Sequence, residues 1–195
     1  MASAISSIYR LKVVLNDIKP EIWRRLLVPA AVTLPRLHDI LQIAMGWMDS
    51  HLHQFIVGRT RYLLPDPDAN LPLAGEQDER SVRLSSLLKK AGQKLLYEYD
   101  FGDGWEHAIL LEEVLDPVAG ETYPRCLTAV RACPPEDCGG PFGYMDLLEI
   151  LSDPKHPDPN EMRQWIGDDF DPETVDLAKI NAALAPRPKR RQRIH

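Results

Sequence analysis

Hydrophobic and polar residues alternate at the start of the chain. Over residues 8–15, apolar side chains alternate with Arg10 and Lys12, which is the period-two pattern of a half-buried strand. After a turn, an apolar run over residues 22–28 ends at Pro29. The pattern therefore predicts a strand followed by its return strand.

The spacing of the apolar residues becomes helical after this pair of strands. Thr33 is a suitable N-cap and Gly46 a suitable C-terminal stop. The residues that recur at helical spacing between them are Leu34, Leu37, Ile40, Leu41, Ala44 and Met45. We expect one amphipathic helix here, packed on the sheet.

The middle of the chain predicts further strands. They cover residues 51–57, 59–64, 95–101, 106–115 and 126–133. A proline-rich segment over residues 65–78 and a short helix over residues 81–90 separate the second from the third. The turn Gly102-Asp103-Gly104-Trp105 predicts a β-hairpin between the third and the fourth.

Helices follow the strands. Short helices are predicted around residues 144–151, 158–166 and 171–184. This order favours an α+β fold, with a largely antiparallel sheet, one early helix packed on it and a C-terminal cluster of short helices. Because 195 residues suit one domain, we assign residues 1–185 to a single domain and residues 186–195 to a tail.

The charge is unevenly distributed along the chain. The formal net charge is -6, yet the tail has no acid and five basic residues: Arg187, Lys189, Arg190, Arg191 and Arg193. Without them, 18 basic residues face 29 acidic ones, so the body has a charge of -11 and should repel polyanions. We expect nucleic acid contact only through the tail. The alternative is that the tail is a disordered, solvated end.

The cellular location follows from what the sequence lacks. Three cysteines do not suit a disulfide framework. No apolar run approaches the roughly 18 residues of a membrane helix, and no apolar signal segment begins the chain. We expect a cytoplasmic protein with no membrane partner.

Several common catalytic motifs are also missing. The sequence contains no G-x-x-x-x-G-K-[ST], no G-x-G-x-x-G, no H-E-x-x-H and no G-x-S-x-G. Nucleotide hydrolysis, dinucleotide-dependent chemistry, zincin proteolysis and the common serine hydrolase mechanism therefore lose their main support.

The first candidate site is the pair His51 and His53. On a strand, residues i and i+2 point to the same face, so the two imidazoles could bind one cation. The alternative is that both rings are structural hydrogen-bonding groups.

The second candidate site is the predicted hairpin turn. It brings Asp100, Asp103 and His107 near one another, and carboxylates beside an imidazole suit a divalent metal or acid–base chemistry. Joined to the histidine pair, they would form a pocket of three or four ligands. The alternative is that Asp103 satisfies the turn and that neighbouring aromatic residues such as Trp105 belong to the core.

The third candidate is the loop that begins at Cys133. Cys133, Cys138 and the distant Cys126 lack the paired knuckles of a structural zinc site. A rigid loop is therefore the preferred interpretation. It exposes Glu136 and Asp137 at its tip, where they could face the histidine pair.

Four blocks of the sequence are distinctive. They are Ile22 to Arg25, Thr33 to Phe55, Tyr99 to His107, and Cys133 to Gly140 with Gly143-Tyr144. These blocks resemble the plasmid pRiA4b ORF-3-like family, over about residues 9–184. The resemblance implies one compact α+β domain and an association with plasmids and insertion elements, and it brings no established activity with it.

Some members of this family carry a resolvase (TnpR) label. A serine recombinase needs its nucleophilic serine just after an N-terminal tyrosine-arginine pair. Here Tyr9-Arg10 is followed by Leu11-Lys12-Val13, so the sequence does not support recombinase chemistry.

Two functions from different classes remain. The protein is either a binding module for an unknown ligand or protein partner, or a metal-dependent hydrolase. Both use a pocket made of Trp47, His51, His53, Asp100, Trp105 and His107. In the hydrolase a divalent metal, the one cofactor that the sequence suggests, would be bound by His51, His53, Asp100 and His107, with Asp103 or Glu136 as the catalytic base. We favour the binding module, because a fold with motif blocks does not imply catalysis.

Overall fold

The computed structural model describes residues 6–65, 74–153, 159–167 and 169–186. The strands are β1 (Ile8–Leu15), β2 (Trp23–Pro29), β3 (His53–Val57), β4 (Thr60–Leu63), β5 (Glu76–Asp78), β6 (Lys94–Tyr99), β7 (Trp105–Leu115) and β8 (Arg125–Val130). The helices are α1 (Leu34–Met45), the 3-10 turn η1 (Glu79–Ser81), α2 (Leu84–Leu87), α3 (Gly140–Ser152), α4 (Pro159–Ile166) and α5 (Leu177–Leu184).

Eight strands in the described part of the chain form one sheet, in the order β5-β4-β3-β6-β7-β1-β2-β8. The neighbouring strands are antiparallel except β4 and β5, which are parallel. The predicted hairpin joins β6 to β7, where Tyr99 pairs with Trp105. The predicted α+β class, with a single domain and a largely antiparallel sheet, is confirmed.

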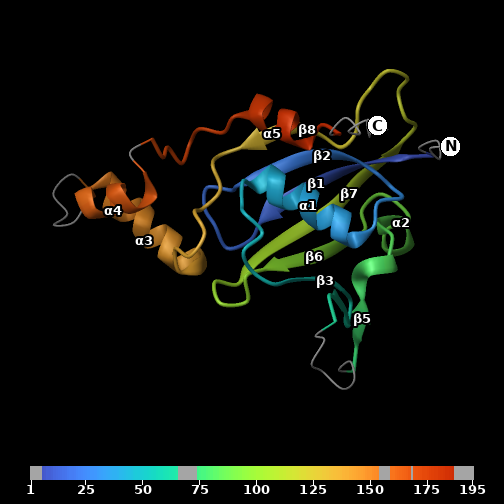
Figure 1. Cartoon of the computed structure of the whole chain (residues 1–195), viewed down its shortest axis with the longest axis horizontal. Helices are drawn as coiled ribbons and strands as arrows, with labels where there is room; N and C mark the ends of the chain where they lie inside the picture. The colour runs from blue at the N-terminus through green and yellow to red at the C-terminus, as the bar shows by residue number, and fades with distance from the viewer. Residues whose placement is uncertain (1–5, 66–73, 154–158, 168, 187–195) are drawn as a thin grey trace, which may run out of the picture.

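One face of the sheet carries the hydrophobic core. Side chains of β1 alternate between this face and the other, so that Tyr9, Leu11, Val13 and Leu15 are buried. Helix α1 lies across the same face (Figure 1) and buries the apolar stripe that its spacing predicts. Thr33 is extended before the helix without a side-chain capping bond, and Gly46 ends it in the left-handed conformation with φ 95°.

Arg24 fastens α1 to the edge of the sheet. Its side chain is buried, and Nε donates to the carbonyl oxygen of Ala44 at 2.8 Å. Its Nη1 donates to the carbonyl oxygens of Trp23 and Val130, each at 3.0 Å. One guanidinium therefore joins the end of α1 to β2 and β8.

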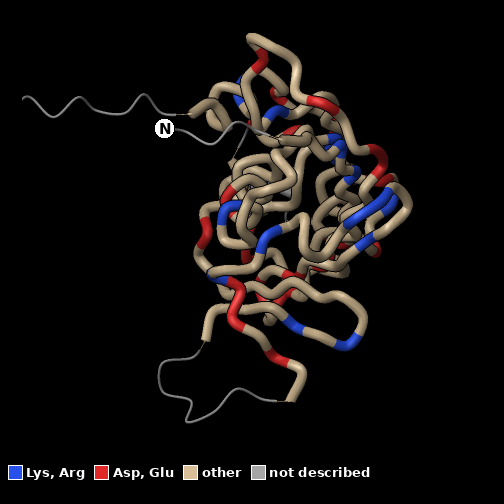
Figure 2. The backbone as a smooth tube through the Cα atoms, turned by 90° about the vertical axis from the view of Figure 1, so that its right-hand side faces the viewer, with Lys and Arg blue, Asp and Glu red and all other residues tan. Residues whose placement is uncertain are grey.

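The other face of the central strands is polar. Arg25 donates to both carboxylate oxygens of Glu112, at 2.7 and 2.8 Å, and Arg10 lies 3.4 Å from the same carboxylate. The Arg25 guanidinium holds the pKa of Glu112 below its usual value. Acidic and basic residues are interspersed along the described backbone (Figure 2).

The C-terminal helices lie in two places. Helices α3 and α4 contact each other at one end of the molecule, whereas α5 lies beside β8 (Figure 1). The Asn181 side chain accepts a hydrogen bond from the Cys126 amide at 2.8 Å and donates to its carbonyl at 2.9 Å. Asn181 thereby satisfies backbone groups on the outer edge of β8.

Two predicted helices are shorter in the structure. The predicted helix over residues 81–90 is reduced to η1 and the single turn α2, because the backbone amides of Leu34 and Leu84 bond to the carbonyls of Val82 and Val32. The last helix begins at Leu177 and not at Asp171. Asp176 is its N-cap, while Asp171 accepts bonds within a preceding turn.

Two strand boundaries also differ from the prediction, and parts of two predicted segments lie outside the described residues. The strand predicted over residues 51–57 begins at His53, and the strand predicted over residues 95–101 ends at Tyr99. Residues 66–73 and the basic tail from residue 187 lie outside the described residues, so the domain boundary at 185 remains a prediction. None of the described helices has the length and apolar character needed to cross a membrane.

Candidate metal centre

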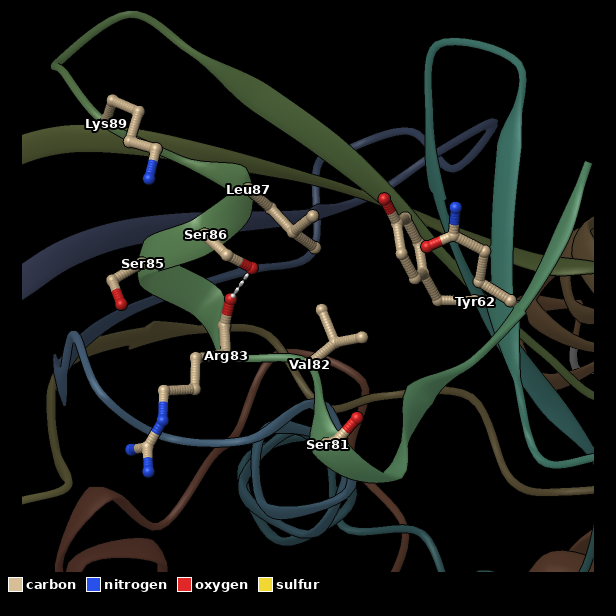
Figure 3. A pocket seen from close by; sticks show the side chains of 9 residues that line it. Tyr62, Ser81, Val82, Arg83, Ser85, Ser86, Leu87 and Lys89 are labelled. Atoms are coloured by element: carbon tan, nitrogen blue, oxygen red, sulfur yellow. Dashed lines mark hydrogen bonds between the residues drawn. The ribbon is translucent and has the colours of Figure 1, made fainter.

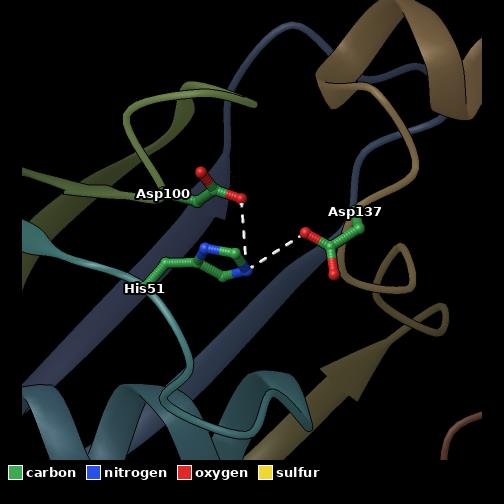
Figure 4. A group of neighbouring side chains, drawn as sticks. All are labelled: His51, Asp100 and Asp137. Atoms are coloured by element: carbon green, nitrogen blue, oxygen red, sulfur yellow. Dashed lines mark ion pairs between the residues drawn. The ribbon is translucent and has the colours of Figure 1, made fainter.

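Three side chains converge at the end of the β6–β7 hairpin. Nε2 of His51 lies 3.6 Å from Oδ2 of Asp100 and 3.2 Å from Oδ1 of Asp137. Figure 4 shows the three side chains pointing toward one another from three separate segments. One ligand atom from each lies within 4.8 Å of the others, which is compact enough for all three to bind a single cation.

The turn after β6 positions Asp100. Its backbone has φ 57°, and its amide donates to the carbonyl of Leu52, next to His51. Oδ1 of Asp100 accepts hydrogen bonds from the amides of Gly102 and Asp103, at 3.0 and 3.3 Å. One carboxylate oxygen therefore stabilises the turn, and the other is left to face His51.

The loop before α3 positions Asp137, which also has a positive φ of 58°. The loop is fastened beside α1, because Trp47 Nε1 donates to the carbonyl of Pro134 at 3.0 Å and the Met48 amide donates to Glu136 at 3.3 Å. The side chain of Asp137 is 73 % exposed, whereas that of Asp100 is 10 % exposed. The cluster therefore opens to solvent on the Asp137 side.

The unsatisfied nitrogen of His51 is the distinctive feature of the cluster. Nε2 is buried, and no described group lies in hydrogen-bonding geometry with it, although two carboxylates are close. A neutral ring that turns its Nε2 lone pair toward two carboxylates is unfavourable, and either a proton on Nε2 or a metal cation between the three groups removes this repulsion.

His53 does not join this cluster. The prediction assumed that the strand runs through His51, but β3 begins at His53, so the two rings diverge. Nε2 of His53 lies 3.1 Å from Oε1 of Glu79, and its ring stacks on His38 with a centroid separation of 3.6 Å. The structure therefore does not bring the predicted histidine pair to one point.

His107 lies in the hydrophobic core. Its ring is fully buried, and Nδ1 lies 3.1 and 3.2 Å from the carbonyl oxygens of Trp105 and Tyr97, so we assign the ring proton to Nδ1. Burial lowers its pKa to about 4. Trp47 packs edge-on against the ring, and Trp105 is buried too. These three predicted pocket residues fill the core beneath the cluster.

The two predicted catalytic bases form hydrogen bonds that hold the site together. Oδ2 of Asp103 accepts from the Gly139 amide at 3.2 Å. The Glu136 carboxylate accepts from the Tyr99 hydroxyl and from the Met48 amide. Both acids therefore already have donors in the loop and hairpin that surround the cluster.

Comparison with known proteins decides the family. Residues 7–179 match the family described as "Plasmid pRiA4b ORF-3-like protein". The chain belongs to this family. The matched residues include the whole candidate metal centre, and the predicted resemblance is confirmed.

Two relatives agree with this membership in the plasmid pRiA4b ORF-3-like family. The chain is 41% identical over 182 residues to "Uncharacterized protein y4hQ" of Sinorhizobium fredii, which covers 92% of each protein. It is 34% identical to the crystal structure of the "Protein of Unknown Function MM3350 from Methanosarcina mazei Go1", with a TM-score of 0.81. That match covers 90% of this chain and 98% of the archaeal one, so the fold is shared over nearly the whole length.

The three cysteines are free thiols that are buried or half-buried. Sγ of Cys133 lies 3.3 Å from Nη2 of Arg24, and Cys126 is buried on β8. Burial raises the pKa of all three thiols, that of Cys138 to about 12. Among the described residues, they take part in no metal-ligand cluster, which agrees with the rigid-loop interpretation.

A separate hollow of about 600 Å³ lies beside α2 (Figure 3). Tyr62 of β4 lines one side, and Arg83, Ser85 and Lys89 line the other. The described residues around it include no acid, so it does not suit a metal cation.

The sequence pattern does not reveal His38, Asp49 and Glu79 as site residues. They line a cleft that also contains His51 and His53. Glu79 lies between the proline-rich segment predicted over residues 65–78 and the helix predicted over residues 81–90. No local sequence pattern relates it to His53. Its complete burial is unusual for an acid and is visible only in the structure.

Proposed function

We propose that this plasmid pRiA4b ORF-3-like protein is a ligand-binding module whose ligand binds through a divalent cation. The cation would be held by His51, Asp100 and Asp137. The observation that carries the proposal is the convergence of these three ligand atoms within 4.8 Å around a buried nitrogen without a hydrogen-bond partner. The family description supports the further proposal that the protein serves a mobile genetic element.

The chemistry of the three side chains suits a divalent metal of the first transition row. One imidazole and two carboxylates are borderline and hard ligands, which favour ions such as Mn²⁺, Fe²⁺ or Zn²⁺ over soft Cu⁺. Two carboxylates also balance the charge of the ion. Three protein ligands leave coordination positions open on the exposed Asp137 side, where a ligand or partner could supply an oxygen or nitrogen donor.

The geometry favours binding over hydrolysis. Hydrolysis is accelerated by a general base within hydrogen-bonding reach of the metal-bound water. Asp103 and Glu136 are the predicted bases, and both accept hydrogen bonds from the protein. Cation-dependent hydrolysis of an ester or amide by the purified protein would replace the binding module with the hydrolase.

Equilibrium dialysis of the purified chain against Mn²⁺ and Zn²⁺ tests the proposal. We expect about one ion per chain for the wild type. Asp100→Asn and Asp137→Asn should weaken binding by more than the roughly 10- to 100-fold that loss of an outer-shell partner costs. Asparagine also tolerates the positive φ at both positions, so these variants should fold.

Asp116→Asn is the matched control, because Asp116 is exposed and lies outside the cluster. Its ion binding should equal that of the wild type. Equal ion binding by all four proteins, or no binding by the wild type, would overturn the proposal.

A further inference from the structure

A cleft of about 640 Å³ lies between the N-terminal half of α1 and the start of β3. His38, His53 and Glu79 line it, together with the more exposed Asp39 and Asp49. His51 borders both this cleft and the candidate metal centre. The cleft is therefore a second site, next to the first.

We assign the proton positions on His38 from its hydrogen bonds. The Gln42 side-chain oxygen accepts from the Asp49 amide at 2.9 Å, so its amide nitrogen is the group that donates to the Tyr97 hydroxyl at 3.0 Å. The Tyr97 hydroxyl then donates to Nδ1 of His38 at 2.7 Å. Nε2–H of His38 donates to Asp49 at 2.7 Å, which leaves the ring neutral. Burial likewise lowers the pKa of His38.

Glu79 lines this cleft and has one unsatisfied side-chain oxygen. The residue is fully buried, and Oε1 lies 3.1 Å from Nε2 of the His53 ring that stacks on His38. Oε2 is also buried and has no hydrogen-bond partner among the described residues. A buried carboxylate oxygen without a donor is costly, so this position is suited to a donor from outside the protein.

The charged residues that line the cleft indicate the chemical class of a complementary donor. Three carboxylates line it, those of Asp39, Asp49 and Glu79, and no Lys or Arg lines it among the described residues, while Asp39 pairs with Arg36 beside it at 3.1 Å. Pro35 and Leu64 supply apolar surface beside them. A ligand with a positively charged N–H group and a short aliphatic chain is complementary to both features.

We propose that this cleft binds an organic ammonium ion, whose N–H groups donate to Oε2 of Glu79. The aliphatic part of the ion packs on Pro35 and Leu64. The proposal does not rest on the cation site. A free amine and the side chain of a lysine in a peptide share this chemistry.

Titration with n-butylammonium, followed by the imidazole NMR signals of His38 and His53, tests this proposal. Excess EDTA in every sample separates the result from the metal centre. We expect saturable shifts with n-butylammonium and much smaller shifts with tetramethylammonium, which has no N–H donor. Glu79→Gln should weaken binding by at least about tenfold, the effect of losing one charge-assisted hydrogen bond.

Two further variants keep the test decisive if Glu79→Gln does not fold. Asp49→Asn keeps the acceptor for His38 and removes one charge, so it should weaken binding by about two- to fivefold. Asp116→Asn should leave binding unchanged. Parallel titrations with a blocked lysine peptide tell which of the two sources binds more tightly.

Three outcomes would overturn the proposal. They are the absence of saturable shifts in the wild type, equal shifts with tetramethylammonium, and equal affinity of Asp49→Asn and Asp116→Asn for n-butylammonium. Each would mean that the cleft does not bind an organic ammonium ion through Glu79.

Discussion

Asp103 and Gly139 join two segments that lie far apart in the sequence. Oδ2 of Asp103 accepts a hydrogen bond from the Gly139 amide at 3.2 Å, which connects the β6–β7 turn to the loop before α3. Gly140 follows with φ 69°, and a Cβ there would overlap the backbone oxygen of Asp103. This close approach is what brings Asp137 to Asp100 and His51.

Gly140→Ala should therefore disrupt both the fold and the cation site. The left-handed backbone and the overlap together should lower the free energy of unfolding by about 2 to 4 kcal/mol, as measured by urea denaturation. Cation affinity should fall with it, because the loop must move away from the turn.

Gly120→Ala separates the two effects of that substitution. Gly120 also has a positive φ, of 84°, but nothing lies within 4 Å of its Cβ position. Its alanine variant should lose only about 1 to 2 kcal/mol and keep the wild-type cation affinity. Equal losses in the two variants would contradict the role assigned to the close approach.

The buried Arg24 should be intolerant of substitution. Arg24→Met removes the buried guanidinium that donates to three carbonyl groups, so we expect a loss of about 3 to 5 kcal/mol in the free energy of unfolding. Arg25→Met removes the half-buried, bidentate pair with Glu112 and should cost about 1 to 2 kcal/mol. Similar losses for the two variants by urea denaturation would refute this ranking.

His107 predicts a specific loss of stability in acid. Its pKa is about 4 in the fold against 6.5 for an ordinary histidine, so between these values the unfolded chain binds a proton that the folded chain does not. The contribution of His107 is complete above pH 6.5 and decreases as the pH falls toward 4, by on the order of 3 kcal/mol in total.

His107→Leu is the variant that checks this dependence. The difference in unfolding free energy between wild type and variant should shrink or reverse from pH 7 to pH 4, because only the wild type loses the His107 contribution. A difference that stays constant over this range would show that His107 does not titrate as described.

The fold could be predicted because most of its elements follow from local patterns. The β1–β2 pair, α1 and the β6–β7 hairpin depend on alternation, helical spacing and a Gly-Asp-Gly turn, and all three are confirmed. The helix predicted over residues 81–90 was wrong in length, since its backbone bonds to residues 30–34, which no local pattern reveals.

The candidate site could be predicted only in part. The sequence indicates His51, Asp100 and the exposed Asp137 separately, but their convergence depends on the approach of Gly139 and Gly140 to the hairpin. His107 has the same parity along β7 as the buried Ile109 and Leu111, so alternation already indicated a core position.

The central claim is that one divalent cation binds between His51, Asp100 and Asp137. Crystals of the protein soaked in Zn²⁺, measured at the zinc absorption edge, test it most directly. The account predicts an anomalous peak about 2.0 to 2.2 Å from Nε2 of His51 and from one oxygen of each aspartate, absent in Asp137→Asn crystals. Soaked wild-type crystals without that peak, or the same peak in the variant, would contradict the account.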